Sequence, residues 1–311
     1  MRVTYNSLPD SLADQLNRLS LQQLRLQNQA ATGRRVQSPE DDPAAMEHVL
    51  ELQTEGRSLD QYKENIDYLK ERSTAAYDAI QGLKKISDRA GEIANLADGT
   101  KSPQELRAYA TEITQLIQQG VDLANSKYNG EFLFAGTQSD QSPFSATLDD
   151  NGQVTAFAYQ GNSKVSECEI GENILIAVQV PGANDSGSGN RGLITDTRTG
   201  SDFFNHLISL QDNLLAADTT AISATDRPAL MQDEDNLVFH LGNYGAVQAR
   251  LDAASASLSS RGSSVQSLIS KEADADLADT LVRLNATQNA YQAALQSGAK
   301  LLNTSLMDYL P

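Results

Sequence analysis

The chain has 311 residues, enough for two or three domains, because a single hydrophobic core rarely grows beyond roughly 250 to 300 residues. Its formal charge of −17 argues against nucleic acid and anionic membrane surfaces as partners, since the protein's own field opposes each contact to a phosphate. The single cysteine, Cys168, excludes an intrachain disulfide and a cysteine-based metal site.

The first predicted element is a helix from about Ser7 or Pro9 to Gly33. Its apolar residues recur every three or four positions and form one narrow stripe with glutamine and asparagine on either side. A narrow stripe is typical of a coiled coil, so this helix is expected to need a partner helix. The stripe consists of Leu12, Leu16, Leu19, Leu26 and Ala30.

A helix-breaking segment follows and contains a glycine, two prolines and two aspartates. We interpret this segment as a hinge. Its aspartates precede a proline at a helix start, where carboxylates cap backbone N–H groups, and this role is favoured over a pair of catalytic carboxylates. The residues assigned to the hinge and to subunit contact are Gly33, Arg34, Arg35, Pro39, Asp41, Asp42 and Pro43.

Two further helices are predicted before the pattern changes. One begins at Pro43 and keeps its apolar spacing to Ala97, which is long enough to indicate a coiled coil or bundle. Ser102 and Glu105 predict a capping box at the start of the next, which runs to about Ser126.

The region 138–227 is predicted to be a β-rich insert. Short β-rich runs alternate there with hairpin-turn residues, and one helix is expected from about Ser201 to Leu215. The insert is strongly acidic, so we expect it to face solvent. Because it continues no helical stripe, a short Gly/Ser linker is expected to replace it without loss of the helical bundle.

Helices resume at about Asp226, with one long stripe that Arg261 to Ser264 is expected to loosen. The last helix repeats the narrow, polar-flanked stripe of the first. We therefore predict that both chain ends pair as a coiled coil through an assembly interface that uses this last stripe. The stripe consists of Leu277, Leu281, Leu284, Tyr291, Leu295 and Leu302.

The predicted fold is mainly α: an elongated helical bundle or coiled coil built from both termini, with a small β-rich inserted domain. Residues 1–40 and 272–311 are assigned to the terminal coiled-coil assembly domain. Residues 41–137 and 228–271 are assigned to a helical rod, and residues 138–227 to the outward-facing insert.

The sequence offers no credible active site, and we expect no enzyme activity, cofactor or metal. Gly187 to Gly192 matches GxGxxG, but no helix is expected to open at the last glycine, so a surface loop is favoured over a dinucleotide site. His48, His206 and His240 have no second ligand at metal spacing and are expected at the surface or an interface. No apolar stretch is long enough for a membrane span, and no cleaved secretory signal is expected.

Four segments in chain order resemble one family. Residues 31–45 read ATGRRVQSPEDDPAA, residues 125–137 read NSKYNGEFLFAGT, residues 159–161 read YQG, and residues 306–310 read LMDYL. Together they resemble the flagellin superfamily and, within it, the hook-filament junction proteins. The departures are Gln37, where the family usually has Asn, and an added Pro311.

The resemblance implies a structural adaptor of the bacterial flagellum. In this family the terminal helices pair as an inner coiled coil, and the variable middle projects outward. The implied partners are copies of the chain itself, the neighbouring hook-associated protein, flagellin and a flagellar export chaperone. The implied location is extracellular, in the flagellum, reached by type III export without a cleaved signal.

Three alternatives remain. A filament flagellin shares the overall plan and differs in polymerising extensively with itself. A coiled-coil signalling receptor is opposed by the missing membrane span, and an enzyme is opposed by the missing site.

Overall fold

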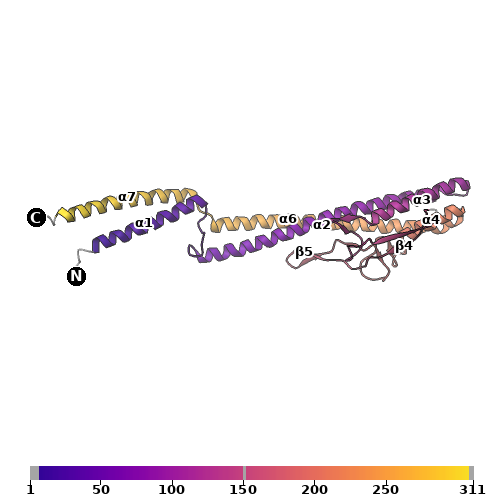
Figure 1. Ribbon diagram of the computed structural model, residues 1–311, viewed down its shortest axis with the longest axis horizontal. Helices are drawn as coiled ribbons and strands as arrows, with labels where there is room; N and C mark the ends of the chain where they lie inside the picture. The colour runs from indigo at the N-terminus through magenta and orange to yellow at the C-terminus, as the bar shows by residue number, and fades with distance from the viewer. Residues whose placement is uncertain (1–6, 150–151, 308–311) are drawn as a thin grey trace. The chain divides into compact units, whose positions relative to one another are not determined.

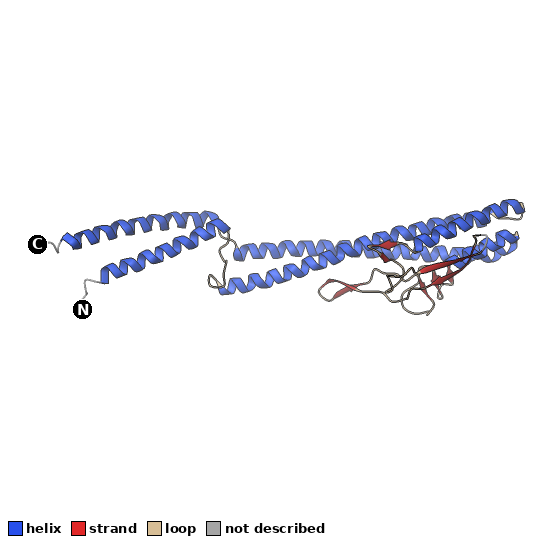
Figure 2. Ribbon diagram, in the orientation of Figure 1, coloured by secondary structure: helices blue, strands red, loops and turns tan. Residues whose placement is uncertain are grey.

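The computed structural model describes residues 7–149 and 152–307, with side chains at 11–149 and 152–300. It divides into two compact units, one of Met1–Leu59 and Ser260–Pro311 and one of Asp60–Ser259. Helices make up most of the described chain, as predicted, and the strands lie in the second unit (Figure 2).

The first unit contains the two terminal helices. Helix α1 (Ser7–Thr32) and helix α7 (Leu277–Met307) lie side by side (Figure 1), which confirms that the chain ends pair. The first turns of α2 (Pro43–Leu96) and the last turns of α6 (Arg227–Ala273) complete the unit.

The expectation that Arg261 to Ser264 would loosen α6 is wrong, because the helix is continuous there. Arg261 Nε lies 2.6 Å from Glu55 Oε1, and Val265 packs near Gly56. These contacts to α2 hold a stretch whose glycine and serines alone favour the helix only weakly.

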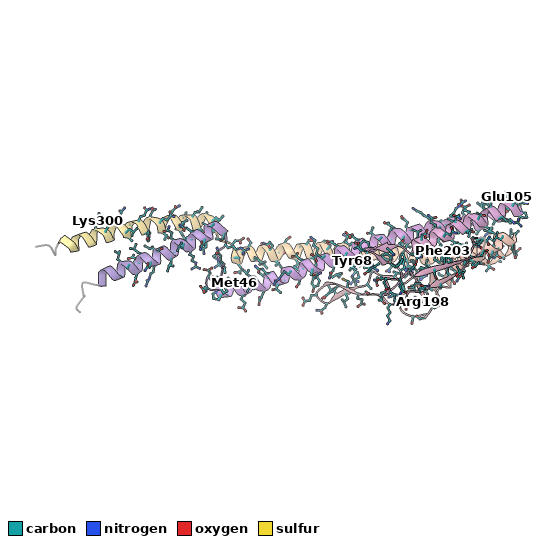
Figure 3. All side chains as sticks on the ribbon, in the orientation of Figure 1. Met46, Tyr68, Glu105, Arg198, Phe203 and Lys300 are labelled. Atoms are coloured by element: carbon teal, nitrogen blue, oxygen red, sulfur yellow. The ribbon has the colours of Figure 1, made fainter. Side chains whose placement is uncertain are left out.

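The second unit is built on α2, α3 (Pro103–Ala124) and α6. The capping box predicted for α3 is present: Glu105 N donates to Ser102 Oγ at 3.3 Å, and Ser102 N donates to Glu105 Oε2 at 2.8 Å (Figure 3 labels Glu105). The apolar stripe of α2 lies in the core, with Ile66, Ile80 and Leu83 fully buried.

Nine short strands belong to the second unit in its described part. Three antiparallel pairs are β1 (Lys127–Tyr128) with β2 (Glu131–Phe132), β3 (Phe144–Leu148) with β4 (Val154–Tyr159), and β5 (Cys168–Gly171) with β6 (Ile174–Ile176). A three-stranded sheet places β8 (Thr195–Asp196) parallel to β7 (Ala183–Asn184) and antiparallel to β9 (Ser201–Asp202). Helix α4 (Phe203–Ala216), the short α5 (Thr219–Ala221) and the π-helical η1 (Ile222–Asp226) lead into α6.

The insert shares one hydrophobic core with the helices, which argues against its replacement by a short linker. The ring of Phe204 on α4 stacks on Phe157 at 4.4 Å between centroids and reaches Gly120 on α3 (Figure 3 labels its neighbour Phe203). Buried Thr114 Oγ1 also lies 3.0 Å from Gln211 Oε1. The prediction relied on the acidic residues of the insert, which indicate a solvent-exposed side. It did not consider the phenylalanines of the insert, which pack between α3 and α4.

Two of the sequence motifs meet in the folded chain. Tyr159 Oη donates to the Phe134 carbonyl at 3.0 Å, and Asn162 N donates to the Ala135 carbonyl at 3.1 Å. Gly136 has φ +66° and lies so close to Asn162 that a Cβ has no room. The LFAGT segment and the chain around YQG are thus the two sides of one joint.

His240 is buried, which corrects the surface or interface expectation for it, whereas His206 is half-buried between two helices. His206 Nδ1 on α4 lies 2.7 Å from Asp233 Oδ2 on α6. Burial opposes the charged form of His206, but the hydrogen bond and the charges of Asp233, Asp202 and Asp226 outweigh it and raise the pKa of His206. His240 is buried, and its Nε2 donates to the Gly192 carbonyl at 3.1 Å.

The second unit is expected to lose stability between about pH 6.5 and pH 4. Burial lowers the pKa of His240 to about 4. In this pH window the unfolded chain is therefore protonated at His240 while the folded chain is not, and protonation favours unfolding. The loss is on the order of 3 kcal/mol. The raised pKa of His206 does not offset it, because that contribution is already complete below the unfolded pKa and is lost only as pH rises.

Chemical unfolding across this pH range measures the effect. His240→Gln, which keeps a donor for the Gly192 carbonyl, should flatten the curve. An unchanged slope in that variant would show that other groups cause the loss.

Candidate functional site

The candidate site is the pair of terminal helices together with the hinge, since these contain every residue singled out for assembly. On α1 the predicted stripe is the covered side of the helix. Leu26 is buried, and the other stripe residues are half-buried, whereas Leu21 and Leu24 are exposed. The half-buried members are Leu12, Leu16, Leu19 and Ala30.

Helix α7 covers α1 with a set of residues that only partly coincides with the predicted stripe, from which it keeps Leu284 and Tyr291. We name the covered set the inner face of α7; three of its six residues are small and buried, namely Thr280, Thr287 and Gly298. The hydroxyl of Thr287 donates to the Arg283 carbonyl at 2.8 Å, so its burial leaves no unpaired group. The other inner-face residues are Leu284, Tyr291 and Ala294, all half-buried.

Three predicted stripe residues of α7 point away from this contact. Leu277, Leu281 and Leu295 are 48%, 49% and 45% exposed, and we name them the outer leucines. The backbone of Leu302 belongs to α7, but its side chain lies outside the described residues. The stripe prediction counted leucines, whereas the contact with α1 buries small side chains such as Thr280, which is next to Leu281, and Gly298, which lies between Leu295 and Leu302.

The hinge is a bonded joint between the two halves of the chain. Gly33 ends α1 with φ +70°, a conformation that favours glycine, and its carbonyl accepts from Ala275 N at 2.8 Å. Arg34 bridges Asp274 through the backbone, and Arg35 N donates to the Ala273 carbonyl at 2.7 Å. The segment after α1 therefore lies against the segment between α6 and α7.

Arg35 and Asp42 tie two helix ends together. Arg35 Nη2 donates to the Glu272 carbonyl at 2.7 Å in the last turn of α6, and its Nη1 lies 3.0 Å from Asp42 Oδ2. Asp42 Oδ1 accepts from Ala45 N at 3.2 Å and so caps α2, the role predicted for it. The hydrogen bond from Ala45, followed by that from Arg35, lowers the pKa of Asp42.

Asp41 organises the loop itself. Its Oδ2 accepts from Gln37 N at 3.1 Å and Ser38 N at 3.2 Å, and its Oδ1 lies 3.2 Å from Arg25 Nη2 on α1. The Gln37 hydrogen bond is the main cause of the lowered pKa of this carboxyl group. Asp42 therefore has the predicted capping role, whereas Asp41 binds backbone N–H groups of the hinge loop and Arg25.

The surface beside the hinge is apolar. A shallow groove of about 580 Å³ is lined by Pro39 and Pro43 from the hinge and by Met46 and Leu50 from α2. Leu50 is exposed, and Met46 is labelled in Figure 3. This groove places the two predicted prolines on an open face of the first unit.

Sequence reasoning missed the residues that complete this site. Val36 is buried in the hinge, and the inner-face residues Thr280, Thr287 and Gly298 were not singled out. A signal for the inner face exists, because its six residues alternate by four and three positions as a heptad seam does. The prediction missed this seam because it counted only apolar side chains, and threonine and glycine were not among them.

The described residues offer little for chemistry. Within residues 7–149 and 152–307 no group of three or more His, Cys, Asp or Glu could hold a metal ion, and none of the helices is apolar enough over its length to cross a membrane. The glycines from Gly187 to Gly192 lie in a loop that leads to β8, with α4 starting only at Phe203, which confirms the surface-loop interpretation.

Two family models match the regions that carry these features. The bacterial flagellin N-terminal helical region matches residues 3–139, and the bacterial flagellin C-terminal helical region matches residues 239–310. Together they match more than half of the chain and include both terminal helices and the hinge. The chain belongs to the bacterial flagellin family. The part of this flagellin-family protein between the two matches is most of the insert.

Two curated relatives align over most of this flagellin-family chain. Flagellar hook-associated protein 3 of Salmonella typhimurium is 25% identical over 313 residues, covering 96% of this chain and 95% of the relative. Flagellar hook-associated protein 3 of Escherichia coli is 27% identical over 285 residues, covering 88% and 86%.

Solved structures share the fold. A protein of Vibrio parahaemolyticus described as a flagellar hook-associated protein has a TM-score of 0.64 at 19% identity, over 75% of this chain and all of that one. FlgL of Bacillus cereus has a TM-score of 0.54 at 18% identity, over 70% of this chain and 97% of that one. At these identities the likeness concerns the fold alone.

Proposed function

We propose that this flagellin-family protein is a structural adaptor of the bacterial flagellum that joins the hook to the flagellin filament. The observation that carries the proposal is the alignment with hook-associated protein 3 along 96% of the chain. The assembly surfaces described above support it, because exposed leucines and an apolar groove suit a protein that binds other subunits. The site supports no enzymatic role.

The partners in this proposal are copies of the chain itself, the neighbouring hook-associated protein on the hook side, and flagellin on the filament side. An export chaperone holds the C-terminal helix before the chain leaves the cell through the flagellar type III channel. Residues 1–40 and 272–311 form the assembly domain, residues 41–137 and 228–271 the rod, and residues 138–227 the outward part.

Within the assembly domain the structure supports a division of labour. Leu12, Leu16, Leu19, Leu26, Leu284 and Tyr291 hold α1 and α7 together, and the outer leucines Leu281 and Leu295 contact neighbouring subunits. The hinge residues fix where the assembly domain begins. A filament flagellin remains the alternative, and the names of the curated relatives favour the junction role.

Electron microscopy with an antibody against this chain tests the proposal. Flagella of the source bacterium should be labelled only in a short zone between hook and filament. Deleting the gene should leave hooks without filaments and release flagellin into the medium. Label along the whole filament would identify the chain as a flagellin instead.

A further inference from the structure

Gly298 lies in the interior of α7, where glycine is an unfavourable residue. Glycine weakens a helix interior relative to alanine, because it loses more backbone freedom on folding. Gly298 is buried, and a Cβ built on it collides with a methyl group of Leu12 on α1. The missing side chain leaves a hole that the Leu12 side chain occupies.

Large side chains on α1 face small side chains on α7 at other positions of the contact as well. Helix α1 contributes leucines, and the inner face of α7 contributes small side chains at Thr280, Thr287 and Gly298. Gly298 is the extreme member of this series, since the threonines still carry side chains. At Gly298 a methyl group of Leu12 takes the space that a Cβ would need.

That point distinguishes one alignment of the helices from its neighbours. Sliding α1 by one helical turn toward the start of α7 brings Leu12 opposite Ala294, whose methyl group occupies the position that is empty at Gly298. Turning α7 to bury its outer leucines removes Thr280 and Thr287 from the contact. Either change also alters which leucines remain exposed for a neighbouring subunit.

We propose that Gly298 is a positioning residue for assembly: by receiving Leu12 it sets the register of α1 on α7 and keeps Leu281 and Leu295 outward. This inference rests on the proposed junction function for its role in assembly. The register itself is a property of the chain alone and is tested separately.

Disulfide trapping tests the register in the purified full-length chain with Cys168→Ser. Leu12→Cys with Gly298→Cys should cross-link several-fold more than Leu12→Cys with Ala294→Cys, one turn away. Equal yields from the two pairs would overturn the inference. This result does not depend on what the protein does in the flagellum.

Filament formation in cells tests the role in assembly. Gly298→Val should abolish filaments, and adding Leu12→Ala should restore them by vacating the space that the valine needs. Gly262→Val is the matched control, because Gly262 lies in α6 with open space around it, and it should leave filaments intact. Normal filaments with Gly298→Val alone, or no recovery in the double variant, would overturn the proposal.

The two proposals fail in different ways. Loss of the junction function would appear as filaments that form normally after the whole gene is deleted. Loss of the positioning role would appear only in the Gly298 variants, with the deletion still preventing filaments.

Discussion

Phe204→Ala is expected to remove about 3 to 5 kcal/mol from the unfolding free energy of the second unit. The ring is fully buried, stacks on Phe157 and contacts α3 at Gly120, so truncation leaves a cavity between the insert and the helices. Whole-domain stabilities are only about 5 to 15 kcal/mol, so the variant should be near unfolding at 37 °C. Denaturant titration followed by circular dichroism measures the loss.

Phe239→Ala is the matched control for this change. Phe239 lies on α6 in the same unit, is 48% exposed, and contacts the Arg191 guanidinium at 4.3 Å from its ring centroid. Its truncation should cost about 1 kcal/mol or less. If Phe204→Ala were no worse than this control, the insert would be a detachable module after all.

The double change Leu281→Asp and Leu295→Asp is expected to abolish filament formation while the monomer stays folded. Both side chains are nearly half exposed, so their loss hardly affects the contact between α1 and α7. In an assembly each buried leucine is worth roughly 1.5 to 3 kcal/mol. A carboxylate placed there must also lose its hydration on assembly. The variant therefore loses the apolar contact and adds a desolvation cost to the assembled state.

Counting flagella by electron microscopy and measuring flagellin in the medium report the outcome. Asn289→Asp with Gln292→Asp adds the same two charges to exposed positions of α7 without removing apolar surface, and it should assemble normally. Leu284→Asp should act differently by separating α1 from α7. Normal filaments with the outer-leucine variant would show that these two residues carry no subunit contact.

Helical spacing predicted the terminal helices and the hinge well. Helix α1 ends at Thr32 and α2 begins at Pro43, as the glycine and the prolines between them indicated. Local chemistry was sufficient there, because caps and helix breakers act within a few residues. The same holds for Ser102 and Glu105 at the start of α3.

Packing between distant segments was much harder to predict. Nothing in the sequence around Phe204 or Gly120 indicates that these two residues are in contact. The acidic composition of the insert suggested an exposed region and gave no indication that its apolar residues belong to the core. The inner face of α7 was missed because a buried threonine or glycine matters only when another helix approaches closely. His240 was missed for a similar reason, since its carbonyl partner at Gly192 is 48 residues away.

The joint between Arg35 and the end of α6 also dictates an order of events when the chain folds. Its hydrogen bond to the Glu272 carbonyl spans 237 residues of sequence, and α1 cannot pair with α7 until these distant segments have met. Closing so large a loop is slow unless the intervening chain is already compact. The second unit, whose residues are contiguous, can shorten that loop by folding beforehand. In a chain cut short before α7, the second unit could therefore fold while α1 stayed without its partner helix, so pairing of the terminal helices is the late step in folding.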